Sequence, residues 1–167
     1  TMTDSAVGVL GVDLDNTYTS AGALPFAQGE PVATKNGRAI LGRAVSGIAQ
    51  YSLVAYAPSS AGASASVDVF LASAANVSGT LLAVAQTSVN SAEYGWFHIE
   101  SHKEGRIRCG VAETGVPLFL TTTGGQIDDA LVSGKALAGL WILESVTSAS
   151  APRAIWRDIK LDRGQLA

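Results

Sequence analysis

YGWFHIESHKEGRIRCGVAETGVPLFLTTTGGQIDD, from Tyr94 to Asp129, contains the clearest β-strand pattern of the chain. Apolar and polar side chains alternate from Trp96 to Glu100 and again from Arg106 to Val111, and a period of two is typical of half-buried β-strands. Between the two runs, Lys103 to Gly105 breaks the alternation and predicts a turn. We therefore expect the two runs to pair as a β-hairpin.

A second hairpin is predicted directly after the first. The apolar run from Val116 to Leu120 is followed by three threonines and then by Gly124 and Gly125. Glycine supplies the positive φ angles that a tight hairpin turn needs. The strands of this region are therefore expected to pair antiparallel with their neighbours in the chain.

The rest of the chain repeats this pattern of short apolar runs separated by turn-forming residues. Strands are expected at Val32–Lys35, Arg38–Ala44, Tyr51–Ala57, Val67–Leu71, Leu81–Gln86, Gly139–Glu144 and Ala154–Leu161. The continuous apolar run Gly139–Glu144 is expected to be buried on both faces, and the charges of Ala154–Leu161 suit an edge strand. Short strands at roughly ten-residue spacing predict an all-β fold, a single antiparallel β-barrel or sandwich domain.

The predicted domain organisation is simple. With 167 residues the chain is long enough to bury one core by itself. Residues 1–23 combine turn-forming segments with interrupted apolar positions, and we expect an extended N-terminal arm there. Residues 24–167 are expected to form the β-barrel or sandwich domain.

Charge is scarce in this sequence. Hydrophobic residues make up 47% and charged residues 15% of the chain, whereas an ordinary soluble domain carries about 25% charged residues. A weakly charged surface is often covered in the working state, so we expect an assembly rather than a free monomer. The net charge of -3 comes without any basic cluster, which argues against direct nucleic-acid binding.

No targeting or membrane segment is predicted. Thr1 to Ala6 lacks the basic and apolar regions of a signal peptide, and no apolar run is long enough to span a bilayer. We therefore expect synthesis and initial residence in the cytoplasm. The single cysteine, Cys109, falls on an inward position of its strand and is expected to pack in the core rather than to act as a nucleophile.

One short motif points to an enzyme. VLGVDLDNT, from Val9 to Thr17, resembles the first motif of haloacid-dehalogenase-type phosphatases. The resemblance implies that Asp13 is the nucleophile, Asp15 the general acid and base, and Thr17 a positioning residue beside Mg²⁺. That family also needs a parallel sheet with crossover helices, which this sequence does not predict. We therefore expect Asp13 and Asp15 to be solvated residues of the arm.

No other catalytic, metal or cofactor site is expected. His98, Glu100 and His102 would share one face of a straight strand, but alternate residues are spread about 6.6 Å apart, too far to hold one zinc ion. A polar face of the hairpin is the favoured interpretation.

Certain aromatic residues are candidates for subunit contacts, because aromatic side chains concentrate binding energy at interfaces. Trp96 and Trp156 stand beside polar or charged strand neighbours, which suits an interface as well as a core position. The candidate interface residues are Tyr18, Phe26, Tyr94, Trp96 and Trp156.

Several segments, taken in order, resemble the small head-decoration, or cement, proteins of tailed bacteriophages. These segments are Thr17–Phe26 (TYTSAGALPF), Ile48–Tyr56 (IAQYSLVAY), Ser91–Ser101 (SAEYGWFHIES), Gly115–Ala130 (GVPLFLTTTGGQIDDA) and Gly139–Ser145 (GLWILES). The resemblance implies a β-rich, non-catalytic protein on the outer surface of the mature capsid, where it bridges subunits of the major capsid protein. It also implies a symmetric homo-oligomer, a dimer or trimer, without a cofactor. The arm Thr1–Ala23 would lie across a capsid neighbour.

Two further functions remain open besides the phosphatase. A carbohydrate-binding β-module would need a row of exposed aromatic residues, for which Tyr94, Trp96 and His98 are the candidates. Another virion part, such as a tail or fibre domain, would share the same fold class.

Overall fold

A computed structural model of the chain describes residues 13–59, 66–77, 80–132 and 135–162. The described residues form ten strands and one short 3-10 helix, η1 (Ala21–Ala23). The strands are β1 (Val32–Thr34), β2 (Gly37–Ala44), β3 (Leu53–Pro58), β4 (Val67–Leu71), β5 (Leu81–Ala85), β6 (Tyr94–Arg106), β7 (Leu118–Leu120), β8 (Ile127–Asp128), β9 (Ala136–Ile142) and β10 (Arg153–Leu161). The predicted all-β class is confirmed.

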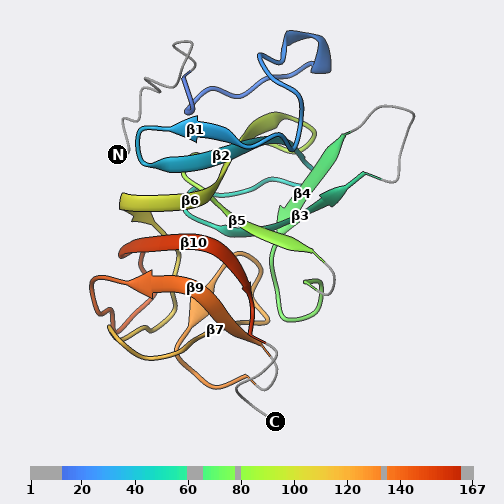
Figure 1. The fold of residues 1–167 in the computed structure, drawn as a ribbon. Helices are drawn as coiled ribbons and strands as arrows, with labels where there is room; N and C mark the ends of the chain where they lie inside the picture. Colours follow the sequence, from blue (N-terminus) through green and yellow to red (C-terminus); the bar gives the residue numbers. More distant parts are fainter. Residues whose placement is uncertain (1–12, 60–65, 78–79, 133–134, 163–167) are drawn as a thin grey trace.

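Half of the strands close into a barrel. The sheet has the order β1-β2-β4-β3-β5-β6-β10-β9-β7-β8, and β2 also pairs with β6. This extra pairing joins β2, β4, β3, β5 and β6 into a closed ring, which fills the upper part of Figure 1. All ladders between these strands are antiparallel except that of β2 with β4. Closure leaves the ring without a free strand edge.

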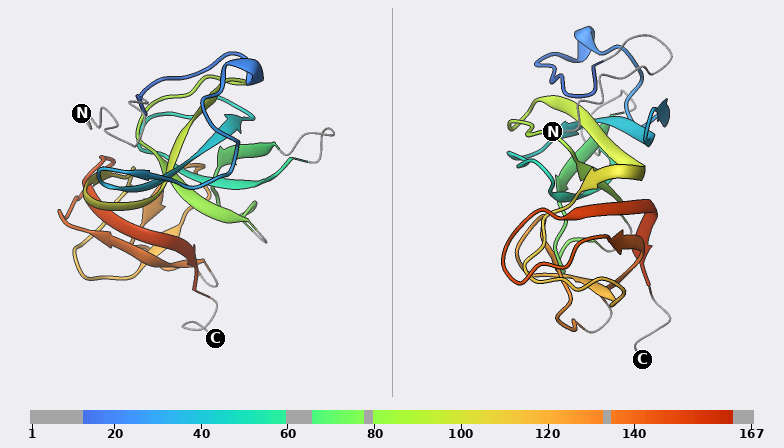
Figure 2. Two further views of the ribbon diagram at one scale, coloured as in Figure 1. Left: turned by 45° about the horizontal axis from the view of Figure 1, so that its top comes forward. Right: turned by 90° about the vertical axis from the view of Figure 1, so that its left-hand side faces the viewer.

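Four of the remaining strands form a second layer against the outside of the barrel. β10, β9, β7 and β8 continue the sheet from β6 and lie below the barrel in Figures 1 and 2. This arrangement needs barrel strands that are apolar on both faces, and β3 meets that need. Val54 points into the barrel core, whereas Leu53 and Ala55 join the core shared with the second layer.

The longest strand, β6, corrects the first hairpin prediction. Lys103 to Gly105 is not a turn, because β6 runs unbroken from Tyr94 to Arg106. Its first half pairs with β2 and β5 and its second half with β10. Gly105 has a packing role: a Cβ added there would lie 2.2 Å from the Trp156 ring. The break in the alternation marks a close approach between strands.

The other hairpin predictions are closer to the structure. β7 and β8 pair antiparallel across a turn in which Gly125 has a φ of 78°. A turn at Asn36-Gly37 is expected between the predicted strands Val32–Lys35 and Arg38–Ala44. β1 and β2 do form a hairpin, but Thr34 pairs with Gly37, so the turn residues are Lys35 and Asn36. Cys109 is buried as predicted, at 1% exposure.

Two predictions about the C-terminal strands are wrong. β10 is not an edge strand, because it pairs with β6 on one side and β9 on the other. β9 is not buried on both faces, since Trp141 is 55% exposed. Both errors arise because the number of neighbours a strand has depends on chain pairing that is remote in sequence.

The described part of the predicted arm is packed on the barrel. Leu14 is 4% exposed and joins a small core with Leu41 and Trp96 on the outside of β2 and β6. Tyr18 and Tyr94 exchange two backbone hydrogen bonds, with N to O distances of 2.9 and 2.8 Å. Residues 13–23 therefore do not lie free, whereas residues 1–12 of the predicted arm are outside the described residues.

Helices contribute little to this fold. Among the described residues, no helix has the length and apolar character that crossing a bilayer requires.

Candidate functional site

The two tryptophans predicted at a subunit interface lie inside the molecule instead. Trp96 and Trp156 are each 1% exposed. Trp96 packs under the N-terminal segment, and Trp156 packs between the barrel and the second layer. Polar sequence neighbours suggested exposure, but in both cases another layer covers the face that carries the indole. Neither side chain is available to a partner.

The other predicted interface aromatics hold the N-terminal segment onto the barrel. Tyr18, Phe26 and Tyr94 are half-buried. Phe26 meets Trp96 edge to face, with ring centroids 5.8 Å apart and an interplanar angle of 71°. Each of the three keeps part of its surface exposed, so a contact with another subunit stays a prediction for them.

The predicted glycan-binding row of Tyr94, Trp96 and His98 is not formed. Trp96 is 1% and His98 2% exposed, so neither presents a ring to solvent. A stacking platform for sugars needs accessible aromatic faces. This face of β6 is covered by the N-terminal segment and is unavailable for that purpose.

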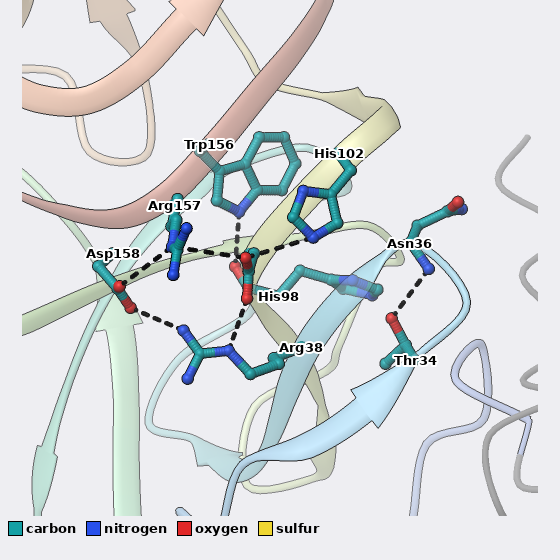
Figure 3. A network of polar contacts seen from close by, with 9 residues as sticks. Thr34, Asn36, Arg38, His98, His102, Trp156, Arg157 and Asp158 are labelled. Carbon is teal, nitrogen blue, oxygen red and sulfur yellow. Dashed lines mark hydrogen bonds and ion pairs between the residues drawn. The ribbon is translucent and has the colours of Figure 1, made fainter.

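Glu100 stands at the centre of a row of charged side chains that crosses three strands. On one side it is paired with Arg38 of β2, and on the other with Arg157 of β10. Figure 3 shows Arg38, His102, Arg157 and Asp158 converging where these strands meet. Directly opposite residues of opposite charge attract one another across a sheet, so the row joins the barrel to the second layer.

The distances explain the ionisation state of Glu100, whose side chain is 9% exposed. Arg38 Nε lies 2.6 Å from its Oε2, while His102 Nε2 and Arg157 Nε lie 3.3 and 3.7 Å from its Oε1. The hydrogen bond from Arg38 is the largest cause that lowers the pKa of Glu100, and burial acts in the opposite direction. An ionised, fully engaged carboxylate is a structural element and is poorly suited to proton transfer.

His98, Glu100 and His102 do not converge as metal ligands. The β2–β6 register shifts between Arg38 and Ala39, which face Glu100 and His98, so β6 does not continue straight. His98 lies in the core, whereas the His102 side chain is 57% exposed. Across the part of the chain that the structure describes, no group of three His, Cys, Asp or Glu side chains is placed to hold a metal ion.

Burial of His98 predicts a stability that depends on pH. Burial lowers its pKa from 6.5 to about 4, so between these values the unfolded chain binds a proton that the folded chain excludes. The free energy of unfolding is therefore expected to fall by about 1 kcal/mol between pH 7 and pH 5.5. Urea unfolding at the two pH values measures this change.

Matched variants separate His98 from the exposed histidine. In His102→Gln the free energy of unfolding should still fall between pH 7 and pH 5.5. In His98→Gln this decrease should be absent. Equal pH dependence in the native chain and in His98→Gln would contradict the assignment.

The phosphatase motif lies in a turn and not at the end of a parallel strand. Asp13 and Asp15 are exposed, and the Asp15 N–H donates to Asp13 Oδ1 at 2.9 Å. Leu14 between them packs in the core, so the segment is anchored by its apolar residue. The haloacid-dehalogenase architecture needs crossover helices on a parallel sheet, and the described residues have η1 as their one helix. The phosphatase alternative therefore lacks its supporting fold.

Cys109 is placed as a core residue. Its Sγ lies 3.7 Å from the carbonyl oxygen of Ile107. Burial is the main cause that raises the pKa of its thiol to about 12, and the charges of Asp128 and Asp129 act in the same direction. A thiol with such a pKa is a poor nucleophile at neutral pH.

An apolar groove of about 340 Å³ lies between β9 and the segment that leads into β7. It is lined by residues 115–118 and 137–142, and none of them is charged. Trp141 and Val116 are the exposed large side chains of this lining, at 55% and 36%. Leu143, two residues beyond Trp141, is also 43% exposed. We call this region the Trp141 groove.

One strand edge in the Trp141 groove is open. β9 pairs with β7 at Leu137 and Ala136, and no described strand pairs with its later residues on that side. Leu143 donates to Arg153 of β10 at 2.9 Å. Because backbone groups alternate in direction along an antiparallel pair, those of Leu140 and Ile142 point away from β10. They are therefore directed toward the groove.

Trp141 is the surface residue that sequence reasoning missed. The run Leu140 to Leu143 has no alternation, so the pattern gives no hint that one face is uncovered. Trp141 is exposed because no described segment forms a further layer over this face of β9, which is a property of the assembled sheet.

Comparisons with protein-family models, with curated proteins and with solved structures find no match to this chain. The resemblance to decoration proteins stays a prediction.

Proposed function

We propose that this chain is a structural, non-enzymatic protein of a tailed-bacteriophage virion, which binds the outer surface of the mature capsid. There it stabilises the shell by bridging neighbouring subunits of the major capsid protein. The sequence resemblance suggests this role, and the Trp141 groove is the structural observation that supports it. It combines a large exposed indole, an uncharged lining and an open strand edge.

These features suit a protein partner. An exposed strand edge binds an extended peptide through main-chain hydrogen bonds, and adjacent apolar pockets add side-chain contacts. A partly exposed tryptophan in a groove is the kind of residue that dominates interface energies. We assign the groove to an extended, uncharged segment of the major capsid protein.

The mechanism requires no catalytic group. A protein that binds only the expanded lattice stabilises it by mass action. If it bridges subunits as a symmetric dimer or trimer, weak contacts at each groove add through multivalency. Residues 13–23 pack on their own barrel, so the groove replaces the predicted arm as the main capsid contact in this proposal.

The direct test is addition of the purified chain to expanded, undecorated heads. Binding is expected to saturate at a copy number fixed by the lattice, and the decorated heads should resist disruption better than bare ones. Absence of saturable binding to expanded heads would overturn the capsid assignment.

Trp141→Ala is expected to weaken binding to the heads by about 30-fold, which corresponds to roughly 2 kcal/mol. The physical reason is the loss of a large, exposed apolar side chain from the lining of the groove. Sedimentation of heads with increasing protein concentration measures the affinity.

Leu81→Ala is the matched control, because Leu81 is 62% exposed and lies on β5 outside the groove. It should bind like the native chain. Native affinity of Trp141→Ala would show that the groove is not the contact.

A further inference from the structure

A second cavity, of about 460 Å³, opens where the barrel meets the second layer. Its walls come from the turn before β3 and the loop after β5, and from segments that follow β6 and precede β10. The polar residues of its lining are Gln50, Tyr51, Ser88, Arg108, Gln126 and Ser150. The volume is within the range of about 300–1,000 Å³ that is usual for small-molecule sites.

The backbone holds Tyr51 in an unusual conformation beside Arg108. Tyr51 has a φ of 67°, which is uncommon for a bulky residue and is often found at binding sites. Its N–H donates to Ala85 O at 2.7 Å, and its carbonyl oxygen accepts from the Arg108 N–H at 2.8 Å. The backbones of Tyr51 and Arg108 are therefore held side by side in the cleft.

Arg108 is the charged residue among the described residues that line this cleft. The Arg108 side chain makes no ion pair or hydrogen bond to any described residue, and the lining includes no carboxylate. Arg106 is not a lining residue, and its guanidinium donates to a backbone carbonyl of the cleft wall at 2.8 Å. The nearby Asp128 carboxylate accepts from the N–H groups of Val111 and Ala130, at 3.0 and 2.9 Å. An unpaired arginine suits a planar carboxylate, which it binds through two parallel hydrogen bonds.

The other polar groups are neutral and suit hydroxyl groups. Gln50 donates through Nε2 to a backbone carbonyl at 2.9 Å, which leaves its Oε1 as an acceptor. The side chains of Gln126 and Ser150 have no hydrogen-bond partner among the described residues. The Tyr51 ring offers a flat apolar face. From these features we propose that the cleft binds a small saccharide that carries a carboxylate, a uronic acid.

The test uses the full chain labelled with ¹⁵N and titrated with glucuronic acid. A ligand of this size is expected to bind with a Kd of about 1 mM. The amide resonances of Tyr51, Arg108 and Gln126 should shift and saturate. Glucose, which lacks the carboxylate, is expected to bind at least about tenfold more weakly.

Arg108→Gln should reduce the affinity for glucuronic acid by at least about tenfold. Arg43→Gln, which alters a half-buried arginine of β2 outside the cleft, should leave it unchanged. A native-like spectrum of each variant confirms that it is folded. The proposal does not depend on the virion role, since it concerns a separate cleft.

Three results would overturn the assignment. One is the absence of saturable shifts at the cleft residues. Another is equal affinity for glucose and glucuronic acid, which would remove the role of the carboxylate. The third is inorganic phosphate producing the same shifts with the same affinity as glucuronic acid, which would reduce the cleft to a general anion site.

Discussion

Trp156→Ala is expected to lower the free energy of unfolding by about 3–5 kcal/mol, the usual cost of removing a fully buried tryptophan. Trp156 is 1% exposed and fills the space above Gly105, between the barrel and the second layer. Its Nε1–H also donates to the carbonyl oxygen of His98 at 3.0 Å, so the substitution leaves a buried carbonyl without its partner. Denaturant unfolding followed by far-ultraviolet circular dichroism measures the loss.

Two companion variants make this result interpretable. Trp156→Phe keeps most of the apolar contact but loses the N–H, and a smaller loss of about 1–2 kcal/mol is expected. Trp141→Ala removes the same type of residue from an exposed position, and its stability should change by less than about 1 kcal/mol. Similar losses at positions 141 and 156 would contradict the assignment of Trp156 as the residue that packs the two layers together.

Glu100→Ala is expected to destabilise the fold by about 2 kcal/mol. The substitution removes the carboxylate that Arg38 and Arg157 share, and a hydrogen bond to a charged group contributes about 1.5–3 kcal/mol. The loss is moderate because the Arg38 and Arg157 side chains are 38% and 72% exposed and Arg38 still reaches Asp158 at 3.1 Å. Denaturant unfolding at neutral pH gives the difference.

The pH dependence provides an independent check on Glu100. Its pKa in the folded chain is lowered, mainly by the hydrogen bond from Arg38. It therefore contributes stability above the pKa of the unfolded chain, and this contribution is lost as the pH falls through the acid range. Glu100→Ala should show a weaker loss of stability on acidification than the native chain.

Glu144→Gln is the matched control for Glu100. Glu144 pairs with Arg153 at 2.6 Å, but the two side chains are 41% and 54% exposed. Solvent screens such a pair, so a much smaller effect is expected. A loss at Glu144 as large as that at Glu100 would indicate that burial of the charged row is unimportant.

The Trp141 groove and the cleft beside Arg108 share no lining residue. The two proposals are testable separately, because Trp141→Ala and Arg108→Gln change different surfaces.

Local patterns in the sequence determined the fold class and several of its details. Alternation with a period of two predicted the all-β fold, and the turn chemistry at Gly124 and Gly125 predicted the β7–β8 hairpin. The inward position of Cys109 in its strand predicted burial. These features depend on residues that are neighbours in the chain, so the sequence contains the information directly.

Only the tertiary structure decided which faces are covered. Trp96 and Trp156 became core residues and Trp141 a surface residue, although all three lie in similar strands. The position of β10 between β6 and β9 is likewise a tertiary feature, which its charges did not indicate. The charged row around Glu100 also forms only when β2, β6 and β10 are assembled. Periodicity tells which side of a strand a residue occupies, but the layer that covers that side comes from segments far along the chain.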